Sequence, residues 1–283
     1  MGDSNAWRRF WNRGGWWRAL IVAIVYIGLY LGVSALSGSA FISAGLIDVA
    51  NLYSDPLSIF FGIAFPILVG GILLLAFAAS LGWTRELFGR QPIRGRGWMW
   101  IAVVIVVVPI AIRLVATDWG SLAATTVLST LFLGLCVGLA EELLTRGIAV
   151  TLLRRAGYGE KIVFVVSSAI FALLHASNAF TQPLLTVVVT VVYAFGFGAM
   201  MYLALRVTGS LIWPILLHAA TDPTTILATG GIDTAMTSSG SVALISAAGL
   251  FNYVYIAFAI VAIFLVKGRV AQKGDLADQP VLG

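Results

Sequence analysis

Six ionisable side chains lie within otherwise apolar stretches of the chain and could carry out acid–base chemistry. They are Glu141, Glu142, Arg146, His175, His218 and Asp222, and they include both histidines of the chain. Carboxylates and imidazoles can take up and return protons, so this combination is typical of hydrolytic and proton-transfer sites. An ionisable group at membrane depth costs at least about 2.5 kcal/mol, so six of them in membrane helices are expected to be functional.

These residues are expected at a similar depth. Each helix can be measured from its nearest basic residue at about 1.5 Å per residue. On this scale Glu141 lies about 20 Å, His175 about 21 Å, His218 about 18 Å and Asp222 about 24 Å from that residue. Three segments of the chain thus bring polar groups to one level, which predicts a shared site. The alternative is that these groups only hydrogen-bond helices to one another.

Spacing predicts which of these groups pair. Glu142 and Arg146 are four residues apart and face each other on a helix, so Arg146 is expected to neutralise Glu142. Glu141 points about 100° away around the same axis and has no partner nearby in the sequence, which suits a general base. His218 and Asp222 are again four apart on one helical face.

The elements that hold these residues must be membrane-spanning helices. Of the 283 residues, 60% are hydrophobic and only 10% charged, a balance that a soluble domain of this size could not carry on its surface. We predict an all-α polytopic membrane bundle that forms one domain, residues 1–283, with a functional core over about 121–228. Cys136 is expected to be a small packing residue. Eight segments approach the length of a span: 18–36, 57–81, 98–117, 121–144, 161–176, 184–205, 210–228 and 241–266.

Basic residues occur in every second loop between these segments. Four arginines precede the first segment and four follow the second, whereas the intervening loop holds only Asp48 and Asp55. Because cytoplasmic loops carry the excess of Lys and Arg, we expect a multi-pass protein of the cell membrane with both termini cytoplasmic. Residues 1–17 are expected to anchor at the lipid interface and 267–283 to form a cytoplasmic tail. The net charge of +5 is therefore attributed to membrane orientation rather than to nucleic-acid binding.

The motifs that carry the six residues resemble those of the CAAX prenyl protease and bacteriocin-processing family, also called the Abi family. Glu141-Glu142 followed by Arg146 looks like its first motif, and Phe171 followed four residues later by His175 looks like its second. Gly209-Ser210-Leu211 leading to His218 and Asp222 completes the set. Three motifs in this order, in predicted helices and at matching depth, are a specific signature, which spans about residues 121–228.

This resemblance implies a metal-independent and cofactor-free endopeptidase that acts on a peptide or membrane-protein substrate. Glu141 and His175 would activate a water molecule, and His218 with Asp222 would stabilise the oxyanion. Eukaryotic members usually have Asn where this chain has Asp222. A protonated Asp222 could donate to the oxyanion itself, or an ionised Asp222 could orient and charge His218.

Three other hypotheses use the same cluster. Glu141, His175 and His218 could bind zinc, although the sequence has no HExxH motif. A proton-coupled transporter could use the Glu and His residues as a relay, although no internal repeat is visible. A catalytically idle immunity or scaffold protein could bind a partner through the same cavity.

Overall fold

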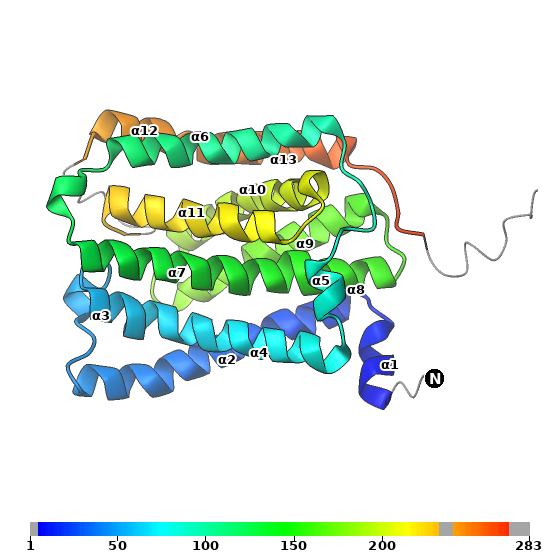
Figure 1. Ribbon diagram of the computed structural model, residues 1–283, viewed down its shortest axis with the longest axis horizontal. Helices are drawn as coiled ribbons and strands as arrows, with labels where there is room; N and C mark the ends of the chain where they lie inside the picture. The colour runs from blue at the N-terminus through cyan, green and yellow to red at the C-terminus, as the bar shows by residue number, and fades with distance from the viewer. Residues whose placement is uncertain (1–4, 232–239, 272–283) are drawn as a thin grey trace, which may run out of the picture.

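The computed structural model describes residues 5–231 and 240–271 as a bundle of long helices, most of which run in a common direction (Figure 1). Of the described residues, 81% are helical and none forms a strand, so the predicted all-α class is confirmed. The first four residues of the predicted interfacial segment and the predicted cytoplasmic tail beyond residue 271 lie outside the described ranges.

The N-terminal half contains α1 to α6. Helix α1 covers Ala6–Asn12 and α2 covers Trp16–Ser43, followed by the short 3-10 helix η1, Val49–Asn51. Helix α3, Pro56–Ser58, continues without a break through the π-helix η2, Ile59–Ala64, into α4, Phe65–Leu81. Helix α5, Thr84–Phe88, and η3, Gly97–Met99, lead to α6, Trp100–Ala116.

The C-terminal half contains η4 to α13. After η4, Trp119–Ser121, one long helix comprises α7, Ala124–Glu142, the π-helix η5, Leu143–Ala149, and α8, Val150–Arg155. Helix α9, Glu160–Leu174, ends in the 3-10 helix η6, His175–Phe180. Helices α10, Leu184–Thr208, α11, Ile212–Thr229, α12, Val242–Gly249, and α13, Phe251–Leu265, complete the bundle.

Seven of the eight predicted spans match helices that are long and apolar enough to cross a membrane. The remaining predicted span, at 210–228, corresponds to α11, which is present but less apolar than those seven helices. It lies between α6 and α7 in Figure 1 and packs against both as well as against α10. Since other helices rather than lipid surround most of α11, it can carry His218, Asp222 and several threonines.

Two glycines bring α7 and α11 unusually close together. A Cβ atom on Gly138 of α7 would lie 2.6 Å from the backbone oxygen of Ile215 and 2.9 Å from the backbone nitrogen of Ala219. Gly134, one turn earlier, meets Ala219 and Pro223 in the same way. Gly134, Gly138 and Glu142 follow one another at intervals of four, so the glycines set the register in which Glu142 meets α11.

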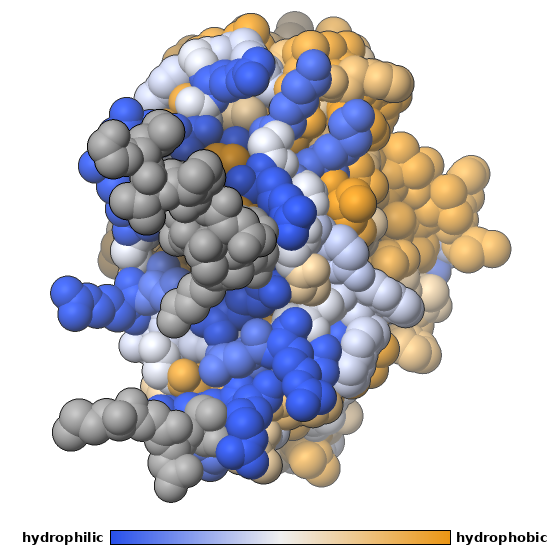
Figure 2. All heavy atoms as spheres, turned by 90° about the vertical axis from the view of Figure 1, so that its right-hand side faces the viewer, coloured by the Kyte–Doolittle hydropathy of each residue, from blue (hydrophilic) through white to orange (hydrophobic). Residues whose placement is uncertain are grey.

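Hydrophilic side chains gather at the end of the bundle where α1, α5 and α8 lie, as Figure 2 shows in a view onto that end. Basic residues belong to all three elements, including Arg9, Arg85 and Arg155. The exposed flank carries large apolar side chains such as Ile24, Val104 and Phe264. An apolar flank with a basic end is the surface expected of a membrane protein.

The close α7–α11 contact makes Gly138→Ala destabilising, because the new methyl group meets backbone atoms that cannot move aside. We expect the free energy of unfolding to fall by about 2 kcal/mol, the usual scale of overpacking. Gly28→Ala in α2 is the matched control, since a Cβ there meets nothing within 4 Å. Thermal unfolding in detergent compares the two variants, and equal unfolding temperatures would contradict the packing argument.

Candidate active site

The first pair of site carboxylates lies where α7 changes into the π-helix η5. Glu141 and Glu142 are the last residues of α7, and Arg146 lies within η5, all of whose residues are buried. Single π-turns within α-helices are rare and occur frequently at functional sites. The hydroxyl of Thr145 donates a 2.6 Å hydrogen bond to the backbone oxygen of Glu141, which ties the two ends of this turn together.

Glu142 is completely buried and joins two helices. Its Oε1 atom lies 3.3 Å from Nη1 of Arg146, which confirms the predicted pair. The same oxygen lies 2.9 Å from Nδ1 of His218 on α11, a contact that the sequence did not predict. An ionised carboxylate can only accept hydrogen bonds, so Nδ1 of His218 carries the proton in this contact. Glu142 therefore fixes the position of His218 and holds a proton on its Nδ1.

Arg146 is also held from three further directions. Its Nη1 donates to the Thr145 hydroxyl at 2.5 Å, and its Nη2 donates to the backbone oxygen of Gly198 on α10. Its guanidinium lies 4.5 Å from the ring centroid of Phe171 on α9, a cation–π distance. A Cβ on Gly198 would lie 2.8 Å from Nη2, so a larger residue there would displace the guanidinium. Arg146 thereby connects α7 to α9 and α10.

The predicted pair of His218 and Asp222 is present on α11. Nε2 of His218 lies 3.5 Å from Oδ2 of Asp222, and the Asp222 side chain is 20% exposed, whereas His218 is buried. The imidazole is thus placed between two carboxylates, Glu142 on one side and Asp222 on the other. A protonated ring can donate to both of them.

His175 is the first residue of η6, immediately after α9 ends. Its Nδ1 lies 3.1 Å from the backbone oxygen of Phe171. A carbonyl oxygen can only accept, so Nδ1 donates the proton, and in the neutral ring Nε2 keeps a free lone pair. The ring packs against Phe171, with centroids 5.2 Å apart. His175 is therefore oriented as a proton acceptor.

Glu141 is the member of the cluster whose carboxylate is least engaged. Its Oε2 atom is buried and has no hydrogen-bond partner in the described part of the chain. Its carboxylate interacts electrostatically with His175, His218, Asp222 and Glu142. All six residues singled out from the sequence are thus linked by contacts or by electrostatic interaction.

Sequence reasoning missed several residues that build this site. Phe171 packs against Arg146 and both histidines, and Phe197 on α10 lies 5.0 Å from the His218 ring. Phe171 was recognised only as part of a motif, and Phe197, Thr145 and Gly198 carry no signal that distinguishes them from ordinary core residues. Within residues 5–231 and 240–271, no three His, Cys, Asp or Glu side chains form a group that could hold a metal ion.

Comparison with known families supports the motif assignment. Residues 123–224 match the family model described as Type II CAAX prenyl endopeptidase Rce1-like, and this range contains all six site residues. The resemblance found in the sequence is thus confirmed over this range. No curated protein and no solved structure matches the chain.

Proposed function

We propose that the protein is an intramembrane endopeptidase that hydrolyses a peptide bond of a membrane-associated or lipidated peptide, without a metal or other cofactor. The Rce1-like core supports a peptidase in general. The observation that carries the finer proposal is the carboxylate of Glu141, which interacts electrostatically with the imidazoles of both His175 and His218. A carboxylate in that position can bind a water molecule and take its proton.

In the proposed reaction, Glu141 removes a proton from a water molecule while the oxygen of that water attacks the carbonyl carbon of the substrate. His175 accepts the second hydrogen bond of that water through Nε2 and so fixes its direction. The carbonyl oxygen becomes an oxyanion, which Nε2–H of His218 stabilises. Glu141 then passes its proton to the amide nitrogen as the carbon–nitrogen bond breaks. The products are a carboxylic acid and an amine, and Glu141 is ionised again.

The remaining charged residues have supporting roles in this proposal. Glu142 and Arg146 hold His218 from the side of Nδ1, so that its other nitrogen faces the reacting carbonyl. Asp222 lies next to that other nitrogen at 3.5 Å, a distance long enough for the proton to be shared with an oxyanion. We therefore favour the hypothesis in which Asp222 orients and charges His218 over the one in which a protonated Asp222 donates a hydrogen bond to the oxyanion.

Replacing Glu141 tests the central step. We expect Glu141→Gln to lower kcat by about 10²-fold or more, the scale of general base catalysis, while thermal unfolding in detergent stays unchanged. Glu86→Gln, at an exposed carboxylate paired with Arg155, is the control for this substitution. In a separate test, purified wild type should still cleave a membrane-associated peptide after exhaustive chelation. Near-normal turnover by Glu141→Gln would refute the general base. Loss of wild-type cleavage on chelation, restored by zinc, would refute metal independence. Cleavage by wild type also distinguishes a protease from a transporter or a scaffold.

Replacing Asp222 separates its two possible roles. If it orients and charges His218, Asp222→Asn removes that charge and should lower kcat about tenfold or more, comparable to the loss of one oxyanion contact. If Asp222 were itself the donor, the amide N–H of Asn would replace it and activity would be retained. The pH–rate profiles of both proteins on one peptide decide between the two, and full activity of Asp222→Asn would contradict the orienting role.

We further propose that the hydrophilic end of the bundle faces the cytoplasm and that the protein lies in the cell membrane. The alternation of basic loops supports this orientation. In a Cys136→Ala background, an impermeant thiol reagent added to intact cells should label Ser121→Cys and leave Thr84→Cys unlabelled. Both positions are exposed in loops or short helices at opposite ends of the bundle. Labelling of Thr84→Cys from outside would reverse the proposed orientation.

A further inference from the structure

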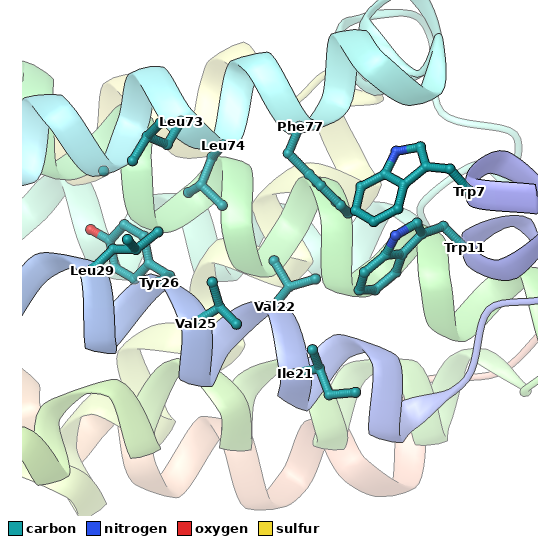
Figure 3. A pocket seen from close by; sticks show the side chains of 11 residues that line it. Trp7, Trp11, Ile21, Val22, Val25, Tyr26, Leu29, Leu73, Leu74 and Phe77 are labelled. Atoms are coloured by element: carbon teal, nitrogen blue, oxygen red, sulfur yellow. The ribbon is translucent and has the colours of Figure 1, made fainter.

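An apolar groove runs along the flank of the bundle between α1, α2 and α4, with a volume of about 320 Å³. Figure 3 shows side chains of α2 and α4 on its two walls and the indoles of Trp7 and Trp11 at one end. No described residue that lines the groove is charged. Val25 and Leu73, on the two walls, are 52% and 42% exposed, so the groove opens onto the apolar flank and suits an apolar ligand.

The length of the groove and its level in the membrane match one chain of a lipid. Ile21 lies beside the tryptophans and Leu29 near the other end, eight residues further along α2, which is about 12 Å. One leaflet contains about 15 Å of hydrocarbon, half of the usual core. The tryptophans belong to α1, at the end where hydrophilic side chains gather, and tryptophan is enriched at the membrane interface. The groove therefore begins at the interface and crosses most of one leaflet.

Helix α4 separates this groove from the helix that carries Glu141. It lies between α2 and α7 in Figure 1 and packs against both. A Cβ on Gly70 would lie 2.7 Å from Cε2 of Tyr26, so this ring lies directly on the α4 backbone and forms part of the inner wall of the groove. The contact of α4 with α7 uses the next residue, Gly71. A chain in the groove thus lies across α4 from α7, which favours a phospholipid of the bilayer over a lipid attached to the reacting peptide.

A cation lies at the mouth of the groove. Nε1 of Trp7 donates a 3.0 Å hydrogen bond to the hydroxyl of Ser80, near the end of α4, and Nε of Arg8 donates to the backbone oxygen of the same serine at 3.2 Å. Arg8 is exposed, and its Nη groups form no hydrogen bond or ion pair within residues 5–231 and 240–271. A guanidinium is well suited to bind the oxygens of a phosphate.

The helix α1 is held on the bundle at both of its ends, so the groove is already formed without a ligand. The rings of Trp7 and Trp11 pack edge-on against Phe77 of α4, with centroids 5.9 and 5.0 Å apart. At the other end of α1, the side-chain oxygen of Asn12 accepts a 3.0 Å hydrogen bond from Nε1 of Trp83. A preformed site loses little conformational freedom when it binds.

We propose that this groove binds one acyl chain of an anionic phospholipid, whose phosphate binds to Arg8. The chain lies between α2 and α4 as far as Leu29, and the headgroup lies beside Trp7. Arg9 and Arg85, at the same end of the bundle, add positive potential, which favours a lipid of net negative charge over a zwitterionic one. The site does not depend on the proposed peptidase activity.

Two tryptophan substitutions in α2 test the groove. Val25→Trp places an indole between the walls and should lower the affinity for phosphatidylglycerol about tenfold or more, an effect that displacing two methylene groups already produces. Ile24→Trp is the matched control, because Ile24 is the adjacent residue, is 68% exposed and does not line the groove. Native mass spectrometry of the purified protein, titrated with the lipid in detergent, counts the bound molecules. Equal binding by the two variants would overturn the proposal.

A charge substitution tests the headgroup contact separately. Arg8→Gln should lower the affinity for phosphatidylglycerol about fivefold and leave the weaker binding of phosphatidylcholine with the same acyl chains unchanged. Arg96→Gln, at an exposed arginine just before η3, is the control and should bind both lipids as wild type does. The proposal is also overturned if Arg8→Gln keeps the wild-type preference for phosphatidylglycerol.

The competing occupant is the lipid group of a lipidated substrate. In that case a lipidated peptide would displace phosphatidylglycerol from wild type, and Val25→Trp would raise KM for that peptide, which would overturn the phospholipid site. We expect no displacement and the same KM for both tryptophan variants. If wild type cleaves no peptide at all, the proposed function fails, and the lipid counts still decide whether the groove binds a phospholipid.

Discussion

The site depends on one buried carboxylate, Glu142, which shares its charge with a cation on its own helix and an imidazole on another. An isolated charge inside a membrane protein is costly to desolvate, and it persists only where partners of opposite charge surround it. Arg146 and His218 supply these partners at the same oxygen of Glu142, at 3.3 and 2.9 Å. The result is a connection between α7 and α11 through one oxygen of Glu142, while the neighbouring Glu141 has a buried oxygen with no hydrogen-bond partner in the described residues. Two adjacent glutamates thus receive different roles, one structural and one proposed to be chemical.

The remainder of the bundle brings these groups into contact. Gly134 and Gly138 let the backbones of α7 and α11 approach, so that Glu142, on the same face, reaches His218. On the other side, Gly198 admits Arg146 to α10, where a backbone oxygen accepts its hydrogen bond. The ring of Phe171 fills the space between the guanidinium and the two imidazoles. Small residues therefore decide how near the helices come, and the charged groups decide in which register they stay.

Much of the helix arrangement and the membership of the site could be predicted from the sequence, because local spacing and hydrophobicity determine both. The pair of Glu142 and Arg146 follows from a separation of four residues. The contact between Glu142 and His218 joins residues 76 positions apart, and only the packing of α7 on α11 reveals it. The packing also explains the lower hydropathy of α11, since its polar residues face other helices.

The most direct test of this account is a double-mutant cycle on the connection between α7 and α11. The free energy of unfolding would be measured in detergent for wild type, Glu142→Gln, His218→Gln and the double variant. If Glu142 and His218 form the buried link described, the two substitutions will not be additive, and the coupling energy will be about 1 kcal/mol or more. Additivity within about 0.5 kcal/mol would show that the two residues are energetically independent and would contradict the account.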